Sequence, residues 1–320
     1  MGSQQLQPVR LGAGTTPLQP APRLAAALGL GPDDLWIKRD DLIGLGGGGN
    51  KVRKLEYSCA QALAAGATAL ITTGAAQSNH ARLTAAAAAR LGLGCTLVLH
   101  GPAPEQALGN LILEMLAGAQ LRWTDGSDEQ AQIDTAANDV RSAGGVPFVI
   151  PFGGSSSASA AGYVECAGEL TDALPDVATV VVAVGSGGTM AGLVAGLGAQ
   201  RVLGVHTGAV DDPVATVVEL LAGMPDVADG SGADRASTLR IVLDQVGDGY
   251  ASITPATRSA IELVARTEGI FLDPTYTGRA MAGLISACAD GAVARGERTV
   301  FLHSGGLPGL LARPEITADR

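Results

Sequence analysis

The feature that most restricts the fold of this chain is a regular alternation between short apolar, β-branched segments and longer segments rich in Ala and Leu. Predicted strands occupy residues 67–73, 95–100, 119–124, 146–150, 177–184, 201–207 and 298–304. Apolar residues between them recur at helical spacing, as with Val52, Leu55 and Cys59, and Gly66 is placed to end that helix. The alternation predicts an α/β fold with twisted, mainly parallel open sheets flanked by helices.

Composition limits the function classes that fit this chain. With 320 residues, 47% of them hydrophobic, the chain can bury the core of one large domain or of two closely packed domains. A net charge of −10 without Lys/Arg clusters argues against binding to nucleic acid or to a membrane surface. No long apolar segment predicts a membrane span or a signal peptide, so we expect a cytoplasmic protein. A Gly- and Asp-rich stretch at 224–236 predicts an exposed loop.

The four cysteines are far apart in the sequence and include no CxxC pair. Each lies in a run of apolar or small residues: Cys59, Cys95, Cys166 and Cys288. This pattern predicts buried free thiols rather than disulfides, and no metal site is expected.

Polar residues at the ends of predicted strands are the candidates for a binding site, because ligands of open α/β sheets bind at the carboxyl ends of strands. Strand 67–73 is followed by Gln77, Ser78, Asn79 and His80, at the start of a predicted helix. Unpaired N–H groups at a helix start attract anions such as a carboxylate. An N-cap is enough to explain any one of these residues alone, but four in succession exceed what one cap needs.

The strongest predicted strand, 177–184, is followed by a glycine-rich segment that opens a helix: Gly185, Ser186, Gly187, Gly188 and Thr189. Successive N–H groups in such a loop form a nest for phosphate. The spacing is not GxGxxG, the next strand ends without an acidic residue for a ribose, and no Walker lysine is present. The loop therefore fits one phosphate monoester better than a dinucleotide.

Lys51 follows four consecutive glycines and Asn50 and opens an amphipathic helix. A lysine at a helix start opposes the helix dipole, although a solvated lysine is the ordinary alternative. The glycine-rich approach indicates a backbone folded closely around a ligand. A desolvated lysine with a lowered pKa is a Schiff-base nucleophile.

Five segments occur in the order seen in one family: GGGNKVRKLEY, GAAQSNHAR, GSGGTMAGL, LDPTYTGRAMAGL and LHSGGLP. Over residues 17–310 the chain resembles the D-cysteine desulfhydrase and 1-aminocyclopropane-1-carboxylate deaminase group. That group has the tryptophan-synthase-β-like fold (fold type II) of pyridoxal 5′-phosphate enzymes. The resemblance implies a homodimer with the cofactor between a small domain, 46–155, and a large domain made of 1–45 plus 156–320.

The resemblance also implies roles for single residues in cofactor binding. Lys51 matches the Schiff-base lysine, Asn79 the partner of the cofactor's 3′-oxygen, and Thr277 the partner of the pyridine nitrogen. Further cofactor contacts are implied for Asn50, Gly185, Ser186, Gly187, Gly188, Thr189 and Ser304.

For the substrate, Ser78 matches a carboxylate-binding and proton-handling residue, with Gln77, Asn79 and His80 beside it. We expect His80 to pack behind the loop rather than to act as a base. Tyr276 matches an active-site tyrosine of a DP-x-Y motif, and Tyr250 resembles a second one.

The residue after Tyr276 bears on the reaction. Cyclopropane deaminases have Tyr-Glu there, and a carboxylate keeps the pyridine protonated better than Thr277 does. A weaker electron sink favours expulsion of a good leaving group over ring opening. The resemblance thus implies β-elimination on a substrate such as D-cysteine, giving pyruvate, ammonia and hydrogen sulfide.

Alternatives remain open at the level of the sequence. They are cyclopropane-carboxylate deamination, elimination from another β-substituted alanine such as L-cysteate, and a non-catalytic cofactor carrier. A nicotinamide dehydrogenase is disfavoured by the missing ribose acid. The chain departs from the family pattern at 153–156, where GGSS replaces GGSN, and at 247–255; we expect both segments to line the substrate end of the pocket.

Overall fold

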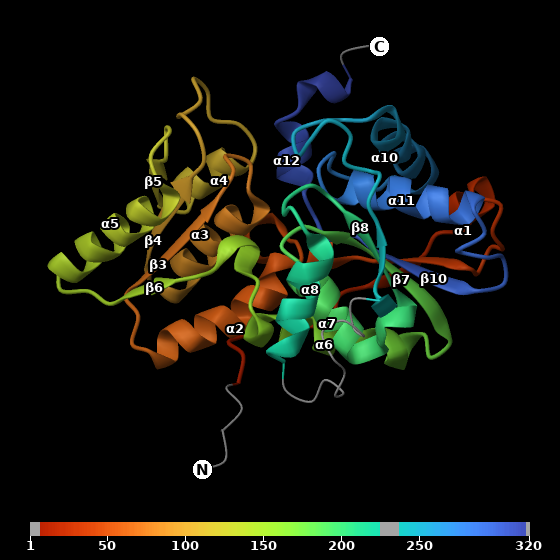
Figure 1. The fold of residues 1–320 in the computed structure, drawn as a ribbon, viewed down its shortest axis with the longest axis horizontal. Coiled ribbons are helices and arrows are strands. Elements are labelled where there is room, and N and C mark those ends of the chain that lie inside the picture. The colour runs from red at the N-terminus through yellow and green to blue at the C-terminus, as the bar shows by residue number, and fades with distance from the viewer. Residues whose placement is uncertain (1–6, 225–236, 318–320) are drawn as a thin grey trace.

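The computed structural model describes residues 7–224 and 237–317, so the predicted loop at 224–236 lies outside the described residues except for Met224. Two sheets organise the chain (Figure 1). The larger sheet contains, in spatial order, β1 (Leu18–Pro20), β2 (Leu35–Lys38), β10 (Arg298–Leu302), β7 (Val177–Val184), β8 (Val202–His206) and β9 (Arg240–Val242). The smaller sheet contains β5 (Gln120–Trp123), β4 (Gly94–Leu99), β3 (Ala69–Gly74) and β6 (Pro147–Val149).

All strand pairs are parallel except β1 with β2. The predicted α/β fold with mainly parallel sheets flanked by helices is confirmed. All seven predicted strands are present, and β7 has the predicted bounds. The strands β1, β2 and β9 were not predicted, because segments of three or four residues with polar or proline positions carry little periodic signal.

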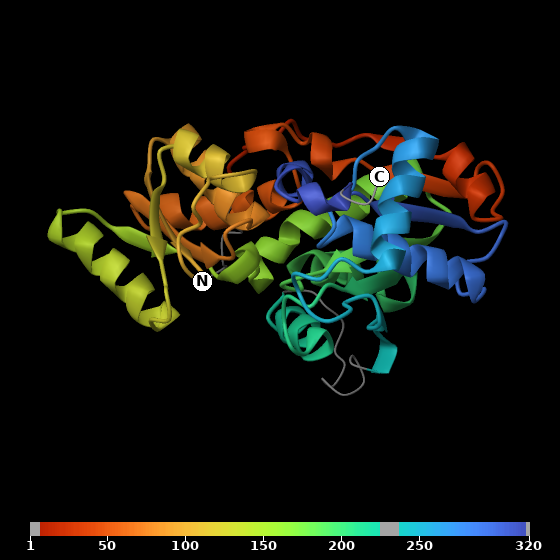
Figure 2. The ribbon, with the colours of Figure 1, turned by 90° about the horizontal axis from the view of Figure 1, so that it is seen from above.

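Helices cover both faces of the larger sheet, and Figure 2 shows the blue and the green helices on opposite sides of it. One face packs against α1 (Pro22–Ala27), α10 (Pro255–Glu268) and α11 (Thr277–Ala289). The other packs against α6 (Ser157–Ala173), α7 (Gly188–Leu197) and α8 (Pro213–Ala222). Strand β7 contributes Val181 to the first core and Val180 and Val182 to the second, which explains its nearly continuous hydrophobicity.

The smaller sheet is also covered on both faces. One face packs against α2 (Lys51–Ala64), α3 (Asn79–Leu91) and α4 (Asn110–Leu116), and the other against α5 (Glu129–Ser142). The remaining elements are the short helix α12 (Leu307–Leu311) and the 3₁₀ turns Asp40–Leu42, Leu45–Gly47, Phe152–Gly154, Ala199–Arg201 and Pro314–Ile316. Within the described residues, no helix is both long and apolar enough to cross a membrane.

The four cysteines are free thiols, as predicted. Cys59 and Cys166 are buried, but the prediction of burial was wrong for Cys95 and Cys288, which are partly exposed. Cys95 lies near the start of β4 and Cys288 near the end of α11, and element ends are covered less completely than their centres.

Candidate active site

A cavity of about 200 Å³ is lined by residues that follow strands of both sheets. Every residue predicted for the site lines this cavity, except Gln77 and Thr277. The structure thus brings together residues from the start of α2, the start of α3, the loop before α7 and the segments around residues 250, 276 and 304.

Lys51 is the first residue of α2 and is partly buried. Its Nζ lies 6.0 Å from the centroid of the Tyr276 ring. Burial lowers the pKa of Lys51 from 10.5 to about 8, against smaller opposing effects of Lys54 and Asp273. An amine with this pKa is partly neutral near physiological pH, which is the state that attacks a carbonyl carbon.

Lys54 lies one helical turn after Lys51 and is 1% exposed. Its Nζ donates to the Gly153 carbonyl oxygen at 2.5 Å and to Ser155 Oγ at 2.9 Å. Burial, followed by the charge of Lys51, holds its pKa well below 10.5. Sequence analysis did not single out Lys54, although the i, i+3 spacing of the two lysines places them on one helix face.

The loop from Gly185 to Thr189 forms a cradle of main chain at the end of β7. Gly187 has a φ of +79°, and α7 begins at the next residue. A Cβ on Gly188 would lie 2.6 Å from Ser155 Oγ, and one on Gly185 would lie 3.1 Å from Cε1 of Tyr276. Glycine at these two positions therefore leaves room where any side chain would crowd the cavity wall.

The donor set around this cradle fits the phosphate of pyridoxal phosphate. Asn50 Nδ2 donates to Thr189 Oγ1 at 3.0 Å, and Ser155 Oγ lies 2.8 Å from Ser186 Oγ. Among the described residues no carboxylate lines the cavity, whereas Lys51 and Lys54 do. Two amines beside the start of α7 without a counter-charge form a site for an anion.

The start of α3 presents hydrogen-bond donors to the same cavity. Ser78 is the N-cap, because its Oγ accepts from the Ala81 N–H at 3.1 Å, and its hydroxyl hydrogen is therefore free to be donated elsewhere. Asn79 Oδ1 accepts from Asn110 Nδ2 at 3.0 Å. This contact occupies the oxygen of the amide and leaves its N–H groups as the donors that Asn79 offers to a ligand.

His80 is buried, and its protonation is set by Thr72. The Thr72 hydroxyl donates to the Ile150 carbonyl at 2.9 Å, so it accepts from His80 Nε2 at 2.9 Å. Burial, with the charges of Lys54 and Lys51, holds the pKa of His80 well below 6.5. His80 is therefore a neutral imidazole with its proton on Nε2, and its packing role stays a prediction.

The two tyrosines form a pair that lines the same cavity. Their hydroxyl oxygens are 2.5 Å apart, and the rings meet edge to face at 73°. Burial raises the pKa of both Tyr250 and Tyr276, so both keep their protons at neutral pH. Arg279, which sequence analysis missed, is fully buried and donates to the carbonyls of Tyr250 and Ser252 at 3.0 and 2.7 Å, holding the Tyr250 loop in place.

The structure does not bring Gln77 or Thr277 into the cavity. The Gln77 side chain donates to the Leu108 carbonyl and accepts from the Asn110 N–H, both at 2.9 Å. The Thr277 hydroxyl donates to Asp273 Oδ1 at 2.7 Å and accepts from the Asp273 N–H at 2.8 Å. Both side chains thus have hydrogen-bond partners within the protein, and neither lines the cavity.

The two segments that depart from the family pattern have different positions. At 153–156, Ser155 lies at the phosphate cradle, and Ser156 forms a capping box with Ser159 at the start of α6. The expectation that this segment lines the substrate end was therefore wrong for Ser156, whose hydroxyl caps a helix. In 247–255, Tyr250 does line the cavity.

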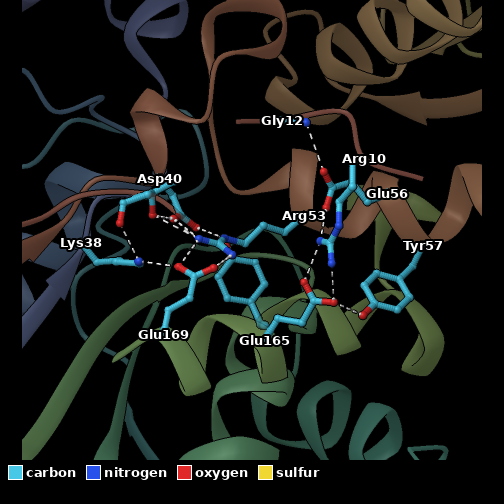
Figure 3. A network of polar contacts seen from close by, with 11 residues as sticks. Arg10, Gly12, Lys38, Asp40, Arg53, Glu56, Tyr57, Glu165 and Glu169 are labelled. Atoms are coloured by element: carbon cyan, nitrogen blue, oxygen red, sulfur yellow. Dashed lines mark hydrogen bonds and ion pairs between the residues drawn. The ribbon is translucent and has the colours of Figure 1, made fainter. Parts of the chain in front are cut away.

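Arg53, two residues after Lys51 on α2, belongs to an ionic network with a buried centre (Figure 3). Arg53 Nε donates to Asp40 Oδ2 at 3.0 Å, and its Nη1 donates to Glu169 Oε1 at 2.7 Å. Lys38 Nζ donates to Glu169 Oε2 at 2.5 Å. Burial alone would raise the pKa of Asp40, but the Arg53 guanidinium holds it below 3.8. The network fixes α2, and with it Lys51, against β2 and α6.

Comparison with known proteins assigns a family. The profile of the family described as "Pyridoxal-phosphate dependent enzyme" matches residues 9–305. The chain is 41% identical over 313 residues to the D-cysteine desulfhydrase of Klebsiella pneumoniae, and 40% identical over 311 residues to that of Salmonella paratyphi B, with 93% of each chain covered.

Solved structures show the same fold. A crystal structure of a homologue of ACC deaminase (the cyclopropane-carboxylate enzyme) matches with a TM-score of 0.84 and 35% identity, covering 97% of this chain and 95% of that one. Threonine deaminase isoform 2 from Solanum lycopersicum matches with a TM-score of 0.65 and 19% identity, covering 97% and 85%. The second match is evidence of the fold alone.

Proposed function

The chain belongs to the family of pyridoxal-phosphate dependent enzymes, with the fold type II architecture, and from that premise we propose that it catalyses β-elimination on D-cysteine or a closely similar amino acid. The products are pyruvate, ammonia and hydrogen sulfide. The observation that carries the proposal is the amine of Lys51, with a pKa of about 8, between an anion cradle and a tyrosine pair. The two bacterial desulfhydrases at about 40% identity support the choice of substrate.

Pyridoxal phosphate, when bound, supplies a carbonyl that captures the amino group and a ring that accepts electrons from Cα. Lys51 is the residue that would hold it covalently. Lys54 and the main chain of 185–189 would hold the phosphate, and Asn79 would donate to a ring oxygen. The role of Thr277 at the pyridine nitrogen stays a prediction.

Other side chains bind the substrate and move its protons. The Ser78 hydroxyl and the free N–H groups at the start of α3 bind the substrate carboxylate. Lys51 Nζ takes the proton from Cα, because its lowered pKa leaves the amine partly unprotonated. Ser78 Oγ is less suited to that task, since it already accepts a hydrogen bond from Ala81. The tyrosines keep their protons; one hydroxyl donates to the other, and the second hydroxyl hydrogen remains to be donated toward the substrate side chain.

Deamination of 1-aminocyclopropane-1-carboxylate is the second candidate, favoured by the 35% identical ACC deaminase homologue. The test measures pyruvate and sulfide from D-cysteine, and α-ketobutyrate from the cyclopropane substrate, with purified enzyme. We expect sulfide from the wild type and none from Lys51→Ala, and borohydride should fix the cofactor to the wild type only. An active Lys51→Ala variant, or α-ketobutyrate as the main product, would contradict the proposal.

We further propose the domain division 46–155 against 1–45 plus 156–320, a cytoplasmic location and a homodimer. The strands of the smaller sheet all lie within 46–155, which supports the division. The side chains of Phe271, Leu307 and Leu311 are exposed around an apolar groove, which supports a dimer contact. Light scattering on the protein eluted from a size-exclusion column tests the proposed dimer, and the mass of a monomer would refute it.

A further inference from the structure

One exposed histidine lines the cavity, and the proposed roles above leave it unused. Several titratable side chains line the cavity in the described part of the chain: Lys51, Lys54, His80, His100, Tyr250 and Tyr276. Lys54 and His80 are buried, and Lys51 and the tyrosines are partly buried. The His100 side chain is 45% exposed, so among these groups it has the most direct access to both the cavity and bulk water.

The position of His100 is fixed by its backbone and by its ring. It follows β4, and its N–H donates to the Gly74 carbonyl at 2.9 Å, beside the loop that leads to Ser78. Its ring Nε2 contacts Glu129 Oε2, the same oxygen to which Thr73 Oγ1 donates at 2.7 Å. Glu129 is the first residue of α5, at the positive end of the helix dipole.

These contacts decide which ring nitrogen exchanges protons. A carboxylate only accepts hydrogen bonds, and the single hydrogen of the Thr73 hydroxyl is already directed to Glu129. His100 Nε2 therefore carries the hydrogen, and Nδ1 is the nitrogen that gains and loses a proton. A carboxylate that orients an imidazole in this way also stabilises the imidazolium that forms.

We propose that His100, oriented by Glu129, carries protons from the cavity to bulk water; the proposal rests on the β-elimination proposed above. When the Cβ–S bond breaks, sulfur leaves as hydrosulfide with both electrons of that bond. Cysteine and water then give pyruvate, ammonium, hydrosulfide and one extra proton. That proton passes from Lys51 Nζ through water to His100 Nδ1, and from Nδ1 to a base in the solvent.

The charged surroundings of His100 suit this task. Neighbouring elements contribute carboxylates from the β5–α5 segment and amines from α2 across the cavity: Asp125, Asp128, Glu129, Lys51 and Lys54. The Glu129 carboxylate contacts the His100 ring, and the two amines line the cavity. An imidazolium at this position is therefore attracted by the Glu129 carboxylate and repelled by the amines of the cavity.

The experiment compares His100→Asn and Glu129→Gln with the wild type, and uses His206→Asn as the matched control. His206 ends β8, contacts the Val210 carbonyl and does not line the cavity. In dilute buffer we expect His100→Asn to lower kcat for D-cysteine by at least about tenfold, with an unchanged KM. Added imidazole should restore most of the loss, because a small base replaces the missing carrier. The control should retain full activity.

Glu129→Gln should lower kcat less, and ¹⁵N NMR of the His100 ring should show a mixed tautomer instead of the Nε2–H form of the wild type. That spectrum does not depend on turnover. The proposal is overturned if His100→Asn keeps the kcat of the wild type. It is also overturned if the loss of kcat does not respond to imidazole and the variant has a lowered melting temperature. A wild type that releases no sulfide from D-cysteine overturns the proposed function instead.

Discussion

Replacing Arg53 with methionine tests whether the buried ionic network holds Lys51 in place. The Arg53 guanidinium makes hydrogen bonds to both oxygens of Asp40 and of Glu169, and one to Thr16 Oγ1. Its removal leaves the fully buried Asp40 carboxylate without its counter-charge. Breaking one partner of a buried pair costs about 3–5 kcal/mol, so we expect the free energy of unfolding to fall by that amount.

Arg10→Met is the matched control, because Arg10 pairs with Glu56 and Glu165 but has a side chain that is 58% exposed. An exposed pair contributes about 0–1 kcal/mol. Guanidinium unfolding of the three apo proteins measures the difference, and cofactor titration measures the consequence for Lys51. Tyr163→Phe removes one 2.6 Å hydrogen bond to Asp40 and should cost about 1.5–3 kcal/mol, which keeps the test informative if Arg53→Met does not fold.

The pH dependence provides a second check on the same network. In the folded protein the pKa of Asp40 is lowered, so its contribution to stability is present above the unfolded pKa and is lost as the pH falls through the folded value. The difference in the free energy of unfolding between the wild type and Arg53→Met should therefore become smaller in acid. The reasoning would be refuted if the Arg53 and Arg10 variants lost equal free energy of unfolding. It would also be refuted if the difference between the wild type and Arg53→Met grew in acid.

Three further outcomes are expected. Lys54→Met should weaken pyridoxal phosphate binding by roughly 10- to 100-fold, because one charge-assisted hydrogen bond is lost, and equilibrium titration measures the affinity. The free energy of unfolding of the apo protein should stay equal or rise, because a buried amine is removed, and denaturant unfolding measures it. The rate at which the apo protein captures the cofactor should rise with pH through about 8, because the neutral amine of Lys51 is the attacking group. Stopped-flow absorbance measures this rate. A rise centred near the ordinary lysine pKa would contradict the assignment of Lys51 as the attacking amine. Gly192→Ala should cost about 1–3 kcal/mol, because its Cβ would lie 2.2 Å from the Ala160 carbonyl oxygen between α7 and α6; an unchanged unfolding midpoint would contradict this.

The central strands could be predicted because burial on both faces leaves a continuous apolar run, as in β7. Short edge strands carry no such run, and β1 includes a proline that a central strand would exclude. The same physics explains the site residues found in advance. Glycines and polar residues are conspicuous where an apolar strand ends, and those at 77–80 and 185–189 are consecutive in the sequence.

The residues that were missed are buried charged side chains within helices or turns. Lys54, Arg279 and Asp273 belong to types that are almost never fully buried unless they are paired. Their partners lie far along the chain, as with Arg279 and the carbonyl of Ser252, so no local pattern reveals them. Conversely, Gln77 and Thr277 lie in the expected segments but do not line the cavity, because side-chain placement depends on hydrogen bonds that the order of motifs does not encode.

The charge distribution reconciles an acidic chain with an anion site. The net charge is −10, yet among the described residues no carboxylate lines the cavity and two lysines do. At physiological ionic strength, charges beyond about 8 Å are largely screened at the surface, so the lining groups determine the local potential. Two carboxylates close to the residues of the site are held by fixed partners: Asp40 by Arg53, and Asp273 by the N–H groups at the start of α11. The acidic surface therefore disfavours polyanions without preventing the entry of one phosphate or carboxylate.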